Sequence, residues 1–216
     1  MATIKAVEKE LKYEFHKWKK QLLIADKFIY VLVVFLLGIF SPDYVVIAAY
    51  LLVIPYVLLT QRKSLYYHFI VSSVIALMWM LIAKGEYGYN RDFLTLAGIN
   101  LYPLFAWAIG LFGAYLIYSH YEHILKEQGF LRQFLLFVAF YWPLLIAVET
   151  IAYHVFDIRN IAAASYLGLP ICDCIHAPKW MQAAYFAMGP VFFSVCYALK
   201  LENPHFRIIE NKDIQQ

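Results

Sequence analysis

Six apolar stretches separated by short polar segments occupy most of the chain. They lie near residues 28–40, 44–60, 65–83, 95–118, 133–156 and 178–199. A helix needs roughly 20 apolar residues to cross the hydrocarbon core of a bilayer. The first stretch is shorter unless residues 25–30 extend it, and a tight turn at Ser41-Pro42-Asp43 joins it to the second. The pattern predicts an all-α integral membrane protein with about six transmembrane helices over residues 27–200.

Residues 1–26 have a different pattern, in which Lys and Glu are interleaved with large apolar side chains. We expect an amphipathic helix that lies on the cytoplasmic leaflet; the alternative is a solvated, partly disordered arm. The first apolar stretch follows this charged segment without a small-residue cleavage site, so we expect a retained helix and not a signal peptide. Residues 201–216 form the predicted cytoplasmic tail.

The composition supports a membrane location. Of the 216 residues, 63% are hydrophobic and 15% are charged, and the mean hydropathy is +0.62. A typical soluble domain is about half apolar and about a quarter charged, and a soluble fold of this size could not hide so much apolar surface. The net charge of +3, with lysines clustered at one end, is typical of a membrane surface and argues against nucleic acid as a partner.

The loops predict the orientation. With six spans, most of the 18 Lys and Arg residues fall on the side that carries both termini and the loops 61–64 and 119–132. The positive-inside rule then places both termini in the cytoplasm. The longer loops 84–94 and 157–177 face outward. Usage rich in Lys, Ile and Tyr is typical of an AT-rich genome, so we expect a bacterial inner membrane.

Glu149 is the sharpest signal for chemistry, because it is the one carboxylate that the pattern places inside a span. An ionisable group in a membrane costs roughly 2.5 kcal/mol or more and usually faces a partner or a cavity. On a helix, Trp142, Glu149 and Tyr153 share one stripe, Asp157 continues it outward, and His154 lies on an adjacent face. Desolvation favours the neutral form of a carboxyl group, so we expect an acid that is protonated near neutral pH. The alternative is a structural Glu149 bonded to another helix.

Two clusters contain metal-ligating residue types. Cys172, Cys174 and His176 lie in the last outer loop, and Cys and His are usual zinc ligands. Their spacing is not a strong zinc pattern, so the alternative is a packed re-entrant loop, and three cysteines make no disulfide framework. His120 and His123 share a helix face, but di-iron membrane oxygenases carry several such clusters, and interfacial polar residues are the alternative.

Motifs for other chemistry are missing from the sequence, which contains no GxGxxG, P-loop, GxSxG or HExxH pattern. We therefore expect neither a nucleotide site nor a redox cofactor. Aromatic residues are abundant, with 18 Tyr and 17 Phe. Some belong to interfacial belts, and the rest suit either ordinary packing or an apolar, conjugated ligand.

The two outer loops are faintly alike. Asn90 precedes Gly98 by eight residues and Asn160 precedes Gly168 by eight, and a Pro and a Trp follow in each case. This spacing hints at a duplicated helix–loop–helix unit, with chance as the alternative.

The first outer loop also carries a family resemblance. Its residues, in order, include Trp79, Gly85, Tyr87, Tyr89, Asn90, Gly98, Pro103 and Trp107. The pattern resembles the small membrane carotenoid-biosynthesis proteins, namely heterodimeric-type lycopene cyclases and carotenoid hydratases, in which a helix ends in G-x-[YW]-x-Y and a Gly, a Pro and a Trp follow. It covers residues 75–120 well and 145–185 poorly. The resemblance implies acid–base chemistry on a long polyene. The chain departs from the cyclases at residues 103–106, where they carry Pro-x-Glu-Glu and this chain has Pro-Leu-Phe-Ala.

Three functions fit these features. The first is a membrane enzyme acting on an isoprenoid, carotenoid or similar lipid, with Glu149 as general acid or base and Tyr153, His154 and Asp157 orienting it or shuttling protons. Its predicted substrate-binding residues are Trp79, Asn100, Trp107 and Trp142. The second is a non-catalytic membrane subunit: the substrate-binding subunit of a transporter, or an accessory subunit of a larger complex. The third, a channel or proton-coupled carrier, has only Glu149, Asn100 and Ser194 as a polar path. A protein partner or a homo-oligomer is compatible with each.

Overall fold

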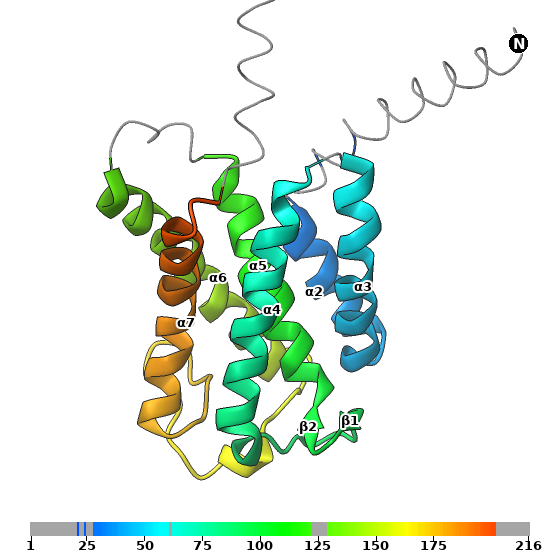
Figure 1. The fold of residues 1–216 in the computed structure, drawn as a ribbon. Coiled ribbons are helices and arrows are strands. Elements are labelled where there is room, and N and C mark those ends of the chain that lie inside the picture. The colour runs from blue at the N-terminus through cyan, green and yellow to red at the C-terminus, as the bar shows by residue number, and fades with distance from the viewer. Residues whose placement is uncertain (1–20, 22–23, 25–27, 61, 122–128, 202–216) are drawn as a thin grey trace, which may run out of the picture.

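The computed structural model describes residues 21, 24, 28–60, 62–121 and 129–201. This part of the chain is mostly helical, which confirms the all-α class (Figure 1). Its helices are α2 (Ile29–Ile39), α3 (Pro42–Thr60), α4 (Ser64–Ala83), α5 (Leu101–Ser119), α6 (Gly129–His154) and α7 (Lys179–Ala198). The predicted amphipathic segment 1–26, the tail 201–216 and His123 lie outside the described residues, apart from residues 21, 24 and 201.

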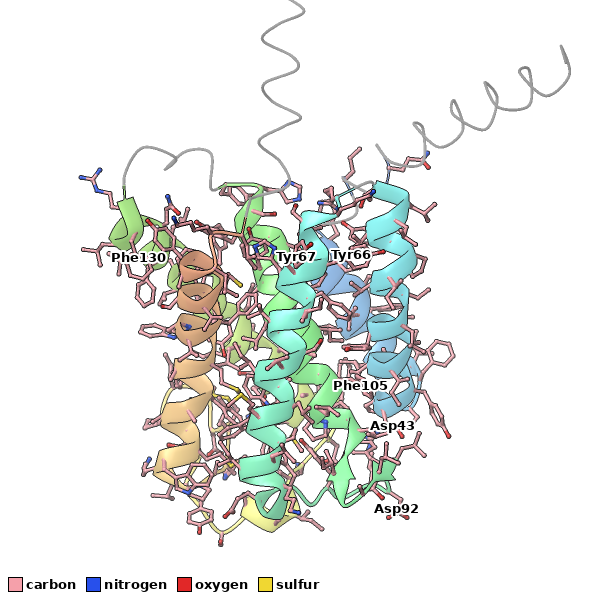
Figure 2. The ribbon with its side chains drawn as sticks, in the orientation of Figure 1. Asp43, Tyr66, Tyr67, Asp92, Phe105 and Phe130 are labelled. Atoms are coloured by element: carbon pink, nitrogen blue, oxygen red, sulfur yellow. A yellow bond between two sulfur atoms is a disulfide. The ribbon has the colours of Figure 1, made fainter. Side chains whose placement is uncertain are left out.

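Four of the described helices are long and apolar enough to cross a bilayer. They are α3, α5, α6, and α4 together with the 3-10 turn Lys84–Glu86 that follows it. The apolar helix α2 has 11 residues, and α7 has 20 residues with a more polar sequence. Large apolar side chains such as Val31, Leu52 and Ile82 are exposed on the outside of the bundle, and Figure 2 shows side chains projecting from its outer faces. Lipid contact accounts for an apolar surface of this extent.

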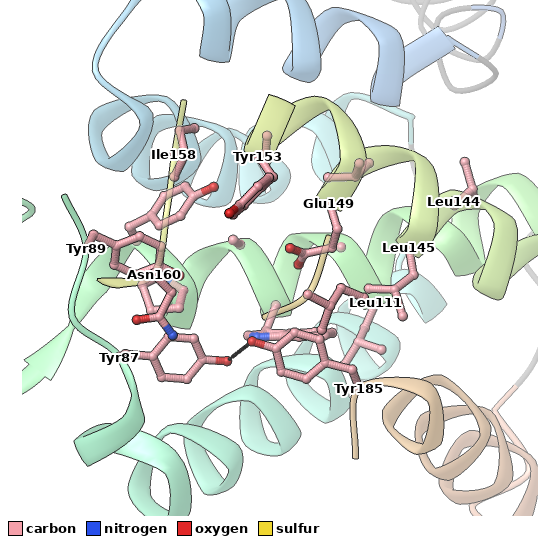
Figure 3. Close-up of a pocket in the computed structure, with 18 of the residues that line it drawn as sticks. Tyr87, Tyr89, Leu111, Leu144, Leu145, Glu149, Tyr153, Ile158, Asn160 and Tyr185 are labelled. Atoms are coloured by element: carbon pink, nitrogen blue, oxygen red, sulfur yellow. Dashed lines mark hydrogen bonds between the residues drawn. The ribbon is translucent and has the colours of Figure 1, made fainter. Parts of the chain in front are cut away.

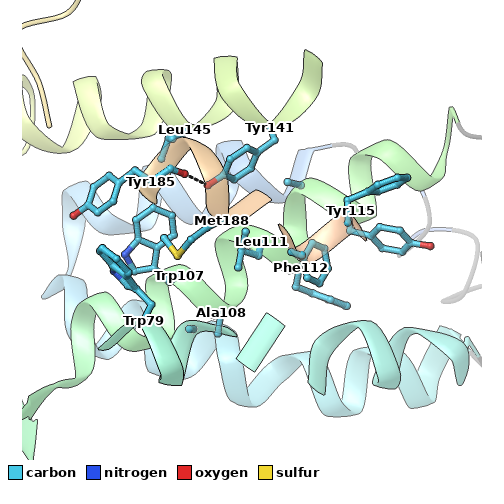
Figure 4. Close-up of a cluster of buried hydrophobic side chains, with 14 of the residues drawn as sticks. Trp79, Trp107, Ala108, Leu111, Phe112, Tyr115, Tyr141, Leu145, Tyr185 and Met188 are labelled. Carbon is cyan, nitrogen blue, oxygen red and sulfur yellow. Dashed lines mark hydrogen bonds between the residues drawn. The ribbon is translucent and has the colours of Figure 1, made fainter. Parts of the chain in front are cut away.

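Helix α5 lies at the centre of the bundle. It packs against α3, α4, α6 and α7, while α2 covers α3 and α4 also contacts α7. Most of its residues are buried, including Leu111, Phe112 and Tyr118. Aromatic rings fill much of the surrounding core, as Figure 4 shows for the region between Trp79 and Tyr115.

The start of α5 differs from that of the predicted stretch 95–118. Residues 95–100 form a small antiparallel hairpin of β1 (Thr95–Leu96) and β2 (Ile99–Asn100), and α5 starts at Leu101. The turn of this hairpin has positive φ at Ala97 (50°) and Gly98 (74°), which no helix contains. Asn100 then caps α5, because its Oδ1 accepts a hydrogen bond from Tyr102 N at 3.0 Å. Turn and cap chemistry here overrides the apolar pattern.

The predicted turn at residues 41–43 becomes the start of α3. Pro42 is the first helical residue, a position where its missing N–H costs nothing. The buried Asp43 carboxylate accepts hydrogen bonds from Ser41 Oγ at 2.6 Å and from Leu94 N at 3.1 Å. It therefore ties this turn to the loop that follows α4.

Loops 84–94 and 157–177, which the sequence predicts to face outward and which we call the outer loops, lie at the same end of the bundle, opposite the start of α2 and the end of α7 (Figure 1). Two asparagines join them reciprocally. Asn160 accepts from Gly88 N at 3.0 Å and donates to Glu86 O at 2.7 Å. Asn90 accepts from Arg159 N at 2.9 Å and donates to Asp157 O at 2.8 Å. This two-fold pattern, with α4–α5 and α6–α7 as its arms, agrees with a repeated helix–loop–helix unit.

Candidate functional site

A cavity of about 130 Å³ lies between α5, α6, α7 and the two outer loops. Its walls are mainly aromatic and aliphatic, and Figure 3 shows the tyrosine rings gathered around it. The aromatic lining residues are Tyr30, Tyr87, Tyr89, Tyr102, Trp107, Tyr141, Tyr153 and Tyr185. An apolar cavity with a few convergent polar groups is the usual form of a small-molecule site.

Among the residues that the structure describes, Glu149 is the only carboxylate that lines the cavity, and no Lys or Arg lines it. It is placed there by α6, on which Tyr141, Leu145, Glu149 and Ala152 follow one another at three- and four-residue intervals and so share one face. Figure 3 shows the carboxyl group pointing into the cavity. Among the described residues, none forms a hydrogen bond or an ion pair with its oxygens. The carboxyl group is therefore available to a ligand.

Beside the cavity, four aromatic side chains form what we call the Tyr–Trp cluster: Trp79 of α4, Tyr87 of the loop that follows it, Trp107 of α5 and Tyr185 of α7. Trp79 Nε1 donates to the Tyr87 hydroxyl at 2.8 Å, and Trp107 Nε1 donates to the same oxygen at 3.1 Å. The hydroxyl groups of Tyr87 and Tyr185 lie 2.8 Å apart. The rings of Trp107 and Tyr185 pack edge to face, with centroids 4.6 Å apart. These contacts hold α4, α5 and α7 in a fixed relation beside the cavity.

The second outer loop closes the cavity through Ile158, Ile175 and His176. Gln182 of α7 holds this loop, since its Nε2 donates to Leu167 O at 2.8 Å and to Ile175 O at 3.0 Å. The His176 ring stacks on Tyr153 with centroids 4.8 Å apart. The loop is therefore a fixed wall of the site.

Cys172 and Cys174 form a disulfide in this loop. Their sulfur atoms are bonded to each other and cannot serve as the thiolate ligands that zinc needs. The suggestion that Cys172, Cys174 and His176 bind a metal is therefore wrong. Instead, His176 Nδ1 lies 2.8 Å from Tyr166 O. Within the described ranges, no three His, Cys, Asp or Glu side chains are arranged to hold a metal ion. The disulfide shapes the loop that walls the cavity.

Four of the predicted site residues lie at the cavity or in direct contact with its lining. Glu149, Tyr153 and Trp107 line it. Trp79 does not line it, and instead contacts it through the hydrogen bond to Tyr87.

The other four predicted site residues lie elsewhere. Trp142 shares a helix face with Glu149 but is 43% exposed, donates to Phe186 O at 3.0 Å and does not line the cavity. Asn100 caps α5. His154 Nε2 lies 2.9 Å from Cys172 O. Asp157 follows the end of α6 with φ of 53°, so the helical stripe does not reach it, and its Oδ1 lies 2.7 Å from Arg159 Nε.

The sequence did not single out most of the tyrosines as site residues. Only Tyr87 and Tyr89 stood in a noted motif, and Tyr102, Tyr141 and Tyr185 did not. Tyrosine is so frequent in the chain that its presence marks nothing. The spacing of Tyr141 and Leu145 ahead of Glu149 on one helix face was the available signal.

Comparison of the chain with protein-family models, with curated proteins and with solved structures gives no match. The resemblance to the small membrane carotenoid proteins therefore stays a prediction.

Proposed function

We propose that this protein is a membrane enzyme that acts on an isoprenoid, carotenoid or similar lipid by acid–base chemistry, without a redox cofactor. The observation that carries the proposal is the single carboxyl group of Glu149, free of protein partners in the described structure and set in a cavity walled by aromatic rings. An ionisable residue in such a place has a functional role by default.

The size of the cavity supports binding of one end of a long lipid. An engineered cavity of about 150 Å³ holds a benzene molecule, and the cavity here measures about 130 Å³. It therefore suits a ring-sized end group, while the rest of the chain of an isoprenoid would lie outside it.

The proposed chemistry needs no oxidant. The Glu149 carboxyl group gives its proton to one carbon of a double bond, which leaves a carbocation and a carboxylate. Loss of a proton from a neighbouring carbon to that carboxylate forms a new double bond and restores the acid. The faces of Trp107 and Tyr185 would stabilise the cation by up to about 2 kcal/mol when water is excluded. Positioned proton transfer of this kind contributes about 10²–10⁴ in rate.

We also propose that α2 and α7 complete six spans, that an amphipathic helix precedes them, and that both termini face the cytoplasm of a bacterial cell. The disulfide between Cys172 and Cys174 supports this orientation, because disulfides persist on the oxidising side of the membrane. That side is the one assigned to loop 157–177 by the distribution of Lys and Arg.

The lipid content of the purified protein tests the site. We expect mass spectrometry of a gentle extract to find an isoprenoid with the wild type. Ala152→Leu, which fills the cavity from α6, should lose it. Ala147→Leu, on an exposed position of the same helix, should retain it. A wild type that carries no isoprenoid contradicts the proposal, and one that arrives with a stoichiometric partner chain instead favours the non-catalytic subunit.

A further inference from the structure

The hydrogen bonds of the Tyr–Trp cluster can be assigned a direction. An indole N–H only donates, and a phenol oxygen has two lone pairs and one proton. The Tyr87 oxygen accepts from both Trp79 and Trp107, so both of its lone pairs are used. Burial raises the pKa of Tyr87 well above its ordinary value, so its hydroxyl keeps its proton. The remaining hydrogen-bond partner of Tyr87 is the Tyr185 hydroxyl, so Tyr87 donates to Tyr185 across 2.8 Å.

This direction leaves the proton of Tyr185 itself available. Its oxygen accepts from Tyr87, and among the described residues its O–H forms no further hydrogen bond. Tyr185 lines the cavity together with Glu149, as Figure 3 shows. Hydrogen bonds in a chain polarise one another, so the two indoles and Tyr87 make Tyr185 a stronger donor toward the cavity.

Tyr89 and Glu149 add to the polar groups that face this space without a protein partner. The described structure gives no hydrogen bond to the Tyr89 hydroxyl or to the Glu149 carboxyl group, and both residues line the cavity. Burial raises the pKa of Tyr89 well above its ordinary value, so it remains a donor. Buried polar groups are nearly always paired, and a purely hydrocarbon ligand would pair none of these. An alcohol can accept from Tyr185 and form a second hydrogen bond with Glu149.

We infer that the end group bound in this cavity carries a hydroxyl, held between Tyr185 and Glu149, so that the ligand is an isoprenoid alcohol and Tyr185 is the residue that selects it. The inference rests on the proposed isoprenoid site and names its ligand class more closely. Asn160 does not compete for this role, because both ends of its side-chain amide bond to backbone groups of the first outer loop.

Three probes of the same chain length test the inference on the wild-type protein: farnesol, farnesyl methyl ether and farnesene. Affinities are measured by calorimetry in nanodiscs and expressed per mole fraction in the lipid, which removes differences in partitioning. The alcohol can bond to both groups, the ether can only accept, and the hydrocarbon can do neither. We expect affinity to fall in that order, by about fivefold or more between farnesol and farnesene, because one neutral hydrogen bond contributes about that factor.

Tyr185→Phe removes the proposed donor and keeps the ring that packs on Trp107. The preference for farnesol over farnesene should fall about fivefold in this variant. Tyr50→Phe is the matched control, since its hydroxyl bonds to Ser73 Oγ at 3.0 Å and does not line the cavity. Its preference should equal that of the wild type.

Equal affinity of the wild type for farnesol and farnesene would overturn the inference and leave the isoprenoid site in place, as would an unchanged preference in Tyr185→Phe. Absence of binding by all three probes would overturn the proposed function as well.

Discussion

Tyr87→Phe is the substitution whose cost follows most directly from the structure. It removes one oxygen and leaves the N–H groups of Trp79 and Trp107 without their acceptor. An unpaired buried donor costs about 1–3 kcal/mol, and two cost about 2–6 kcal/mol. Both indoles are buried, but Trp107 also lines the cavity, where its N–H can be solvated once the Tyr87 oxygen is gone. We therefore expect the free energy of unfolding to fall by about 2–4 kcal/mol, the lower half of that range.

Equilibrium unfolding in mixed micelles, followed by the near-ultraviolet circular dichroism of the tryptophans, measures this loss. Tyr50→Phe serves as control, because it breaks one hydrogen bond while Ser73 keeps its bond to Phe69 O at 2.7 Å, and we expect about 1 kcal/mol for it. Adding Trp79→Phe to Tyr87→Phe removes one stranded donor, so the double variant should cost less than the sum of the single ones. The reasoning is refuted if Tyr87→Phe costs no more than Tyr50→Phe.

Three further predictions concern the frame of the site. Gly189→Ala places a Cβ into the Tyr141 ring and should lower the free energy of unfolding by about 1–3 kcal/mol. The control Gly85→Ala, whose Cβ meets nothing within 4 Å, should change it by less than about 0.5 kcal/mol. Equal losses for the two variants in chemical unfolding would contradict this prediction. Cys172 and Cys174 should react with iodoacetamide in denaturant only after reduction, and reduction should cost about 1–2 kcal/mol for so small a loop; labelling without reductant, read by mass spectrometry, would disprove the bond. Asn160→Ala removes two hydrogen bonds to the opposite loop and should speed hydrogen exchange of the Gly88 backbone amide, which donates to the Asn160 side chain. An unchanged exchange rate would show that these hydrogen bonds do not hold the two loops together.

The helices could be predicted because each coincides with an apolar run, and four of these helices are long and apolar enough to cross a bilayer. Their ends were less predictable, since local hydrogen bonds decide them. The apolar residues Leu96 and Ile99 suggested the start of a helix. They form a hairpin instead, because Ala97 and Gly98 between them adopt positive φ. The same limit applies to Asp157. A longer helix would have placed it on the face of Glu149, but α6 ends at His154 and Asp157 lies outside the site.

The site could be found from sequence only where one residue was chemically out of place. Glu149 met that condition because a charge in an apolar helix is costly. Tyr87 and Tyr185 did not, because tyrosine is common here and their contact joins positions 98 apart in the chain. The bond between Cys172 and Cys174 was not expected from a spacing of two residues. Contacts between distant segments, not residue types, created the rest of the cavity.

Uptake of deuterium by a polyene tests the central claim most directly. Wild-type protein in vesicles that contain farnesol, an isoprenoid alcohol of the inferred ligand class, is incubated in deuterated water, and the carbon-bound deuterium of the extracted lipid is measured by mass spectrometry. Proton transfer from Glu149 predicts uptake by the wild type, a loss of about 100-fold or more in Glu149→Gln, and unchanged uptake in Asp92→Asn, whose carboxylate is exposed in the first outer loop. Equal uptake by the wild type and Glu149→Gln, or none by the wild type, would contradict the assignment of Glu149 as the acid.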